Sequence, residues 1–172
     1  MRALALTLLL LLASPAAADD AWHVVKANGF TVEMPLPPNA EEQKVDLGGG
    51  KTATMRTWQA RQMVTPGAIY DVTVAEYPKS SFDAAKIEEH LDGARNGAVA
   101  NAAGPLLGET RIEFAGHPAR ELLIDMTMGY NSRTVVFIDG DRLFSLGAIT
   151  RKDNERSPAI ERYFASFKLI RP

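Results

Sequence analysis

The sequence predicts an α+β fold in which a central antiparallel β-sheet is flanked by helices. Residues 111–150 contain three hydrophobic runs separated by turn-forming residues, which is typical of three neighbouring antiparallel strands. Both faces of these strands are apolar, so both need a cover. Residues 80–98 and 157–167 repeat apolar side chains at helical spacing and can supply that cover.

The register of the central strands follows from the predicted turns at residues 129–132 and 140–141. With these turns, Ile124 lies opposite Phe137, and Phe137 lies opposite Phe144. A second row joins Met126, Val135 and Leu146 in the same way. One face of the sheet is then predicted to carry Leu122, Ile124, Met126, Val135, Phe137, Phe144 and Leu146.

Strands are also expected in the first half of the chain. Residues 22–26 and 30–34 flank an Asn-Gly turn, and prolines end the second run. Residues 41–47 and 51–60 flank three consecutive glycines, which predicts a hairpin with a flexible tip. Residues 68–77 form the next strand, with Tyr70, Val72 and Val74 on one face.

Two helices complete the predicted fold. Ser80 and Asp83 stand at the positions of a helix cap before Ile87 and Leu91, and Gly104-Pro105 ends the segment. In the C-terminal segment, Ser157 and Pro158 suit the first positions of a helix. That helix would bury an apolar stripe made of Ile160, Tyr163, Phe164 and Phe167.

Residues 1–18 have the pattern of a cleaved signal peptide. One cation, Arg2, precedes an apolar run over residues 3–13, and Ala16-Ala17-Ala18 fits a cleavage site. The run is shorter than the ~20 residues that span a bilayer. We therefore expect a single domain over residues 19–172 that is exported to the periplasm or secreted and is not embedded in the membrane after cleavage.

The composition excludes several kinds of chemistry. The 172-residue chain has no cysteine, so it has no disulfides and no thiolate nucleophile. Its formal charge of −2 and lack of a basic patch argue against nucleic acid as a partner. His23, His90 and His117 have no partner residues at metal-ligand or catalytic spacing, so we expect no metal, no cofactor and no enzymatic activity.

One polar group stands out around the central hairpin. Arginine and tyrosine are common anchors of binding interfaces, and a docking patch for a protein or an anionic ligand is one interpretation of this group. The alternative is a solvated edge with ion pairs across strands. The candidate partner-binding residues are His117, Arg120, Glu121, Tyr130 and Arg133.

Four short segments carry a resemblance to the PsbP-like family of exported bacterial proteins. They are FTVEMP at 30–35, GHPARE at 116–121, RLFSL at 142–146 and FASFKL at 164–169. The resemblance implies an α/β/α sandwich with a central antiparallel sheet. Relatives of this fold, among them a photosystem II extrinsic subunit and a Ran-binding nuclear import factor, are accessory and binding proteins, and the resemblance brings no catalytic motif.

The sequence therefore predicts a soluble, non-catalytic accessory or binding protein of the cell envelope. We expect its partner to be an envelope protein. A small-ligand carrier or minor enzyme with a pocket between sheet and helix is the alternative. A structural envelope protein that oligomerises through an exposed strand is a third hypothesis.

Overall fold

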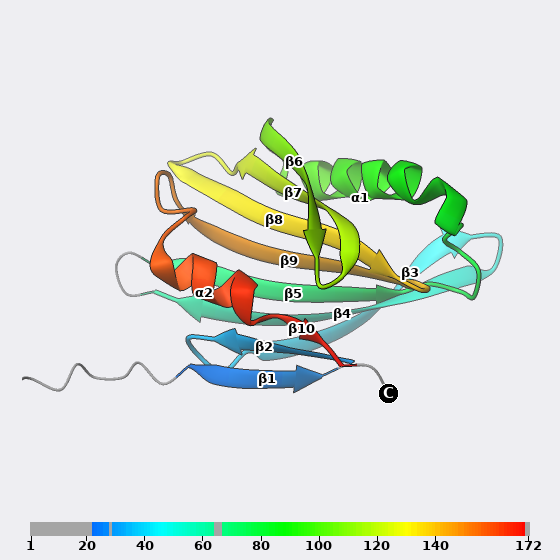
Figure 1. The fold of residues 1–172 in the computed structure, drawn as a ribbon, viewed down its shortest axis with the longest axis horizontal. Coiled ribbons are helices and arrows are strands. Elements are labelled where there is room, and N and C mark those ends of the chain that lie inside the picture. Colours follow the sequence, from blue (N-terminus) through cyan, green and yellow to red (C-terminus); the bar gives the residue numbers. More distant parts are fainter. Residues whose placement is uncertain (1–21, 28, 64–66, 171–172) are drawn as a thin grey trace, which may run out of the picture.

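The computed structural model describes residues 22–27, 29–63 and 67–170. Within these residues the fold has ten strands, a short 3-10 helix and two α-helices (Figure 1). In chain order they are β1 His23–Ala27, β2 Phe30–Met34, β3 Asn39–Gly48, β4 Lys51–Gln62, β5 Ala68–Glu76, η1 Ala84–Lys86, α1 Ile87–Ala102, β6 Leu106–Phe114, β7 His117–Asp125, β8 Tyr130–Asp139, β9 Arg142–Arg151, α2 Pro158–Ser166 and β10 Lys168–Leu169.

Seven of these strands form one antiparallel sheet in the order β3-β4-β5-β9-β8-β7-β6, and β1, β2 and β10 form a second, smaller sheet. The register of the β8–β9 hairpin is confirmed, because Val135 pairs with Leu146 and Phe137 pairs with Phe144. The rings of Phe137 and Phe144 stack with centroids 4.8 Å apart. The predicted face of β5, with Tyr70 among its buried residues, is confirmed as well.

The predicted register between β7 and β8 is wrong. Phe137 pairs with Ala119 in place of Ile124, a shift of five residues. An odd shift reverses the faces of a strand, so Ile124 lies on the side of the sheet away from Phe137. The cause is the turn, which is complete by Gly129 because Thr127 and Met128 both adopt positive φ, 64° and 46°. Residues other than glycine rarely adopt that conformation, so the sequence pattern favoured a later turn.

The main core lies on the face of the large sheet that carries Phe137 and Phe144. The small sheet and α2 cover this face, and Phe167 contacts Phe30, Phe137 and Phe144. The predicted apolar stripe of the C-terminal helix is confirmed, since Ile160, Tyr163 and Phe164 are buried. The aromatic side chains thus join two sheets and one helix into a continuous core.

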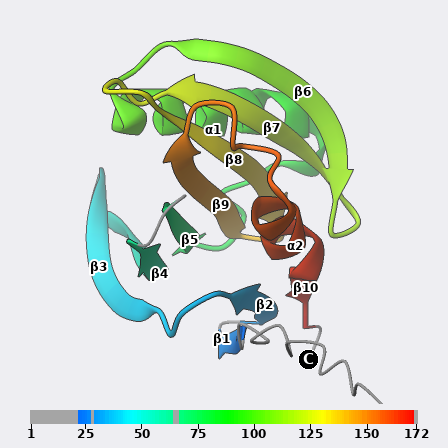
Figure 2. The same cartoon turned by 90° about the vertical axis from the view of Figure 1, so that its left-hand side faces the viewer.

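The opposite face carries α1, which packs on β7 and β8 and buries Leu91. The end-on view of Figure 2 shows β8 and β9 between the two helices. The antiparallel sheet with flanking helices is confirmed, but the small sheet shares one face with α2, so that face is not a purely helical layer. The predicted helix start at Ser80 is also wrong: Ser80 has a φ of 62°, and Asp83 caps the 3-10 turn that leads into α1.

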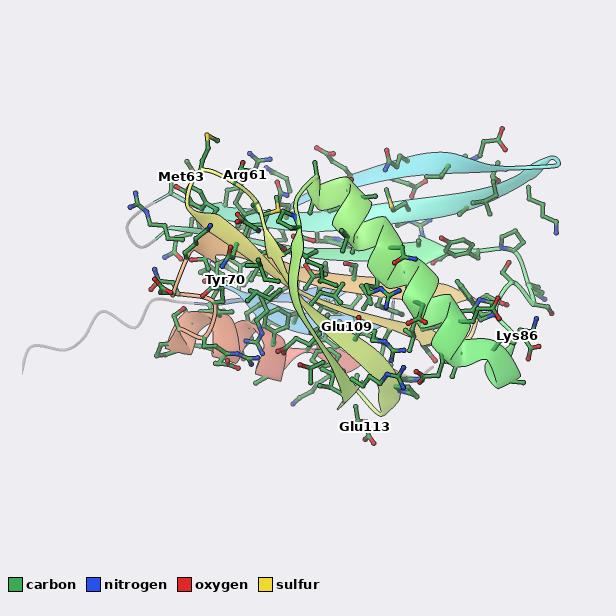
Figure 3. The ribbon with its side chains drawn as sticks, turned by 90° about the horizontal axis from the view of Figure 1, so that it is seen from above. Arg61, Met63, Tyr70, Lys86, Glu109 and Glu113 are labelled. Carbon is green, nitrogen blue, oxygen red and sulfur yellow. The ribbon has the colours of Figure 1, made fainter. Side chains whose placement is uncertain are left out.

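The predicted hairpin around the three glycines is confirmed as β3 and β4. All ten residues of β3 are exposed, and Gly48, Gly49 and Gly50 have positive φ at the tip. Figure 3 shows this hairpin extending past the end of α1, whereas the other end of β4 reaches Met63. One end of β4 therefore lies at the exposed hairpin tip, and the other end lies near Met63 on the opposite side of the molecule.

Candidate functional site

Arg120 lies inside the molecule between β7, β6 and α1, with 1% of its side chain exposed. Its Nη2 atom is 2.6 Å from Glu88 Oε2 and 3.2 Å from Asp92 Oδ1, both on α1. Its Nε atom lies 2.9 Å from Glu109 Oε1, in an ion pair without hydrogen-bond alignment. Burial alone would lower the pKa of Arg120, but the hydrogen bonds to Glu88 and Asp92 raise it above its ordinary value. Arg120 therefore fixes α1 to the sheet.

Arg133 belongs to a different network on the opposite face. Its Nη2 atom is 2.7 Å from Glu121 Oε2, and its Nη1 atom is 2.9 Å from Glu161 Oε1 on α2. The guanidinium also lies 4.5 Å from the centre of the Phe164 ring. Arg156 pairs with Glu121 and Glu161 and closes the network. Arg133 thus ties α2 to the sheet, as Arg120 ties α1.

The structure does not bring the five predicted residues together in one exposed cluster. Arg120 and Glu121 are neighbours on β7 and so point to opposite faces. His117 stacks on Phe137 and lies 3.7 Å from Asp139, whereas Tyr130 lies at the other end of β8. The prediction of a single exposed patch is wrong in this respect. The role of these residues in partner binding stays a prediction.

A cavity of about 380 Å³ lies at the end of the large sheet where Tyr130 is found. We call it the sheet-end pocket. The end of β4, the start of β5, the end of β9 and the β7–β8 turn form its walls. Its volume falls in the range of small-molecule sites, ~300–1,000 Å³. The residues that give it its character are Met63, Ile69, Met126, Met128, Tyr130, Ile149 and Arg151.

The β7–β8 turn determines the shape of this pocket. Asp125 accepts a hydrogen bond from the Thr127 N–H, and the Met126 N–H donates to the Tyr130 carbonyl. Asp125 also pairs with Lys152 at 3.0 Å, and that hydrogen bond is the main reason that its pKa is lowered. The tight turn leaves the Met128 side chain 91% exposed beside the cavity. Local backbone bonds thus present a large apolar side chain to solvent.

The sheet-end pocket differs from the one in the alternative hypothesis. That hypothesis placed a ligand pocket between sheet and helix, whereas the residues that line the sheet-end pocket come from strands and loops and none belongs to α1 or α2. Sequence reasoning missed the site because it placed Met126 in the buried sheet face. The signal that it overlooked is Met126-Thr127-Met128 directly before a glycine, three residues of a turn with two thioether side chains.

Asp71 lies on the same face as the pocket, further along β5. Its carboxylate faces Gly147, where an added Cβ would lie 2.5 Å from Oδ1. Burial raises the pKa of Asp71 from 3.8 to about 6. The folded protein therefore holds the proton of Asp71 more tightly than the unfolded chain does.

The pH dependence of stability should show this effect. Because the folded state binds the extra proton between pH 4 and 6, wild-type stability contains a term that falls as pH rises through this window. Asp71→Asn removes this pH-dependent contribution. The free energy of unfolding of the variant, relative to that of the wild type, should therefore rise by on the order of 1–2 kcal/mol from pH 4 to pH 7. Denaturant unfolding of both proteins at several pH values measures the difference. Parallel pH profiles would contradict it.

The described residues contain neither a candidate metal-binding group nor a helix suited to span a membrane. Over residues 22–27, 29–63 and 67–170, no three histidine, cysteine, aspartate or glutamate residues come together in a group that could hold a metal ion. Within the same ranges, no helix is long and apolar enough to cross a bilayer. The expected absence of a metal stays a prediction.

Comparison with solved structures supports a PsbP-like fold. The solution structure of cyanobacterial PsbP (CyanoP) from Synechocystis sp. PCC 6803 matches with a TM-score of 0.51 and 12% identity, over 91% of this chain and 96% of that one. A crystal structure of a protein of unknown function from Pseudomonas aeruginosa matches with a TM-score of 0.43 and 15% identity, over 88% of this chain and 98% of that one. No family model and no curated protein sequence matches this chain.

Proposed function

We propose that this chain is an exported, non-catalytic binding protein of the cell envelope, and that it binds at the sheet-end pocket. Export is supported by the signal-peptide pattern of residues 1–18, which lie outside the described residues. The place of binding is supported by the pocket itself. It replaces the predicted arginine patch, whose two arginines are engaged in holding the helices.

The observation that carries this proposal is the concentration of exposed apolar side chains around the cavity. Met63 is 83% exposed and Met128 is 91% exposed, and both line the same cavity as the partly exposed Tyr130. Single exposed apolar side chains are normal, but a group of them beside a concave site marks a binding surface. Methionine is also common at surfaces that adapt to their ligands, because its side chain is flexible and polarisable.

The location of the reactive side chains favours binding over turnover. The chain has no cysteine, and none of its three histidines lines the pocket. His90 accepts a hydrogen bond from the Asp83 N–H, and His117 stacks against Phe137. No carboxylate is among the pocket-lining residues that the structure describes. A described lining without histidine, cysteine or carboxylate side chains is suited to holding a ligand unchanged.

Site-specific photo-crosslinking tests this proposal. A benzophenone amino acid placed at Met128 should form an adduct, with a protein or a small molecule, when cells that produce the protein are irradiated. The same residue placed at Val24, 68% exposed on β1, is the matched control and should not react. Intact-mass spectrometry and gel electrophoresis detect both kinds of adduct.

The comparison between adducts at Met128 and at the control position Val24 decides whether the proposal holds. Adducts at position 128 alone support binding at the sheet end. Adducts at neither position, or equally at both, would contradict the proposal.

A further inference from the structure

We propose that the sheet-end pocket takes an amphipathic anion, a single apolar chain that ends in a carboxylate, as in a medium-chain fatty acid. This inference rests on the proposed function and names the ligand class for the same site. It is carried by the placement of the arginines relative to the apolar surface of the pocket.

The arginines fall into two groups. Ten lie in the described residues, and eight of them form ion pairs with carboxylates. Arg61 and Arg151 are the two described arginines for which no carboxylate lies within ion-pair distance, and Arg61 bonds only the neutral side chain of Gln59. Figure 3 shows Arg61 beside Met63 at the pocket end of β4. The unneutralised arginines are therefore found at one place.

The sheet register puts both arginines on the pocket side of the sheet. Arg61 pairs with Ile69 across β4 and β5, and Ile69 pairs with Ile149 across β5 and β9. Arg151 follows Ile149 by two residues and so shares its face. Neighbouring strands are ~4.8 Å apart, so the two isoleucines form a short apolar strip. Arg61 lies beside Ile69 on β4, and Arg151 lies two residues beyond Ile149 on β9.

Electrostatics then selects the ligand. The third cation nearby, Lys152, is neutralised by Asp125 at 3.0 Å, and no described carboxylate lines the cavity. A neutral apolar molecule would leave both arginines without a partner. The three thioethers could hold a soft metal cation, but the positive charges of Arg61 and Arg151 oppose one. An anionic head on Arg151, with the charge of Arg61 next to the pocket and an apolar chain on Ile69, Ile149 and Met126, uses both the charge and the apolar lining of the site.

Calorimetric titration of the purified protein with decanoate, decanol and decylamine tests the ligand class. These three probes share one apolar chain and differ in charge. Decanoate should bind at least about tenfold more tightly than decanol, since a hydrogen bond to a charged group contributes about that factor. Decylamine should bind more weakly than decanol.

Variants separate the charge from the apolar surface. Arg61→Gln with Arg151→Gln should reduce decanoate binding to the level of decanol and leave decanol binding unchanged. Arg111→Gln with Arg156→Gln removes the same charge from two exposed side chains away from the pocket and should change nothing. Met63→Leu with Met128→Leu keeps the apolar volume and should retain decanoate binding. Thermal unfolding of each variant checks that it is folded.

Two results would overturn the inference: decanoate that binds no better than decanol, or an unchanged decanoate affinity in the Arg61 and Arg151 double variant. Crosslinking at position 128 distinguishes this failure from failure of the proposed function. If crosslinks form there while decanoate does not bind, the ligand class is wrong and the binding site stands. If both fail, the pocket has no binding role.

Discussion

Replacing Phe137 with alanine should lower the free energy of unfolding by about 3–5 kcal/mol. Phe137 has no exposed surface and stands at the centre of the aromatic core. Its ring stacks on Phe144 and contacts Phe114 and Phe167, so it joins β8 and β9 to the end of α2. A cavity at this point cannot close easily, because three different elements would have to move together.

Urea denaturation measures this loss, and Leu107→Ala is its matched control. Leu107 is 52% exposed on β6, so truncating it should cost about 0.5 kcal/mol or less. A loss below about 1 kcal/mol for Phe137→Ala would show that the core is not centred on this ring.

Replacing Arg120 with methionine should be almost as costly, about 3 kcal/mol. The long apolar side chain fills the volume, but Glu88, Asp92 and Glu109 lose the cation that they share. Removing one partner of a buried ion pair typically costs about 3–5 kcal/mol. We expect the low end, because the Glu88 and Asp92 side chains are 52% and 43% exposed and can be hydrated.

Arg111→Met is the control for Arg120→Met. Arg111 also pairs with Glu88, but its side chain is 74% exposed and the distance is 3.5 Å. The change there should lie within about 0.5 kcal/mol of zero, as for most surface pairs. If both variants were equally stable, Arg120 would not be the residue that holds α1 on the sheet. Hydrogen exchange of the α1 amides would locate the effect of Arg120→Met.

The local structure was largely predictable from sequence. Alternation of apolar residues predicted β2, β5, β8 and β9, and the apolar stripe beginning at Ile160 predicted α2. In each case the spacing of the apolar residues within a short segment shows which face is buried. The Gly140-Asp141 turn was also identified, because glycine supplies the positive φ that it needs.

The register of β7 was not predictable in the same way. The turn before Tyr130 uses Thr127 and Met128 in conformations that these residue types rarely adopt. Since a shift by an odd number of residues exchanges the two faces, this one turn moved Arg120 from an expected surface patch to a buried ion-pair network. The predicted exposed cluster of arginines is therefore not formed.

The sheet-end pocket was out of reach of sequence reasoning for a further reason. Ile69 and Ile149 are 80 residues apart in the chain and become neighbours only because β5 pairs with β9. Met63 and Met128 line the same pocket because strand pairing brings the end of β4 and the start of β8 to the same end of the sheet. Pairing between strands that are distant in sequence leaves no local pattern, so only the three-dimensional structure reveals it.

Binding at the sheet-end pocket is tested most directly by methyl NMR of the protein labelled with ¹³C at its methionine methyl groups. The label reports on the pocket through Met63, Met126 and Met128 and on the rest of the fold through Met34 and Met55. When envelope extract from unlabelled cells is added, the three pocket signals should shift or broaden, and the signals of Met34 and Met55 should stay in place. Unchanged pocket signals, or changes confined to Met34 and Met55, would contradict binding at this site.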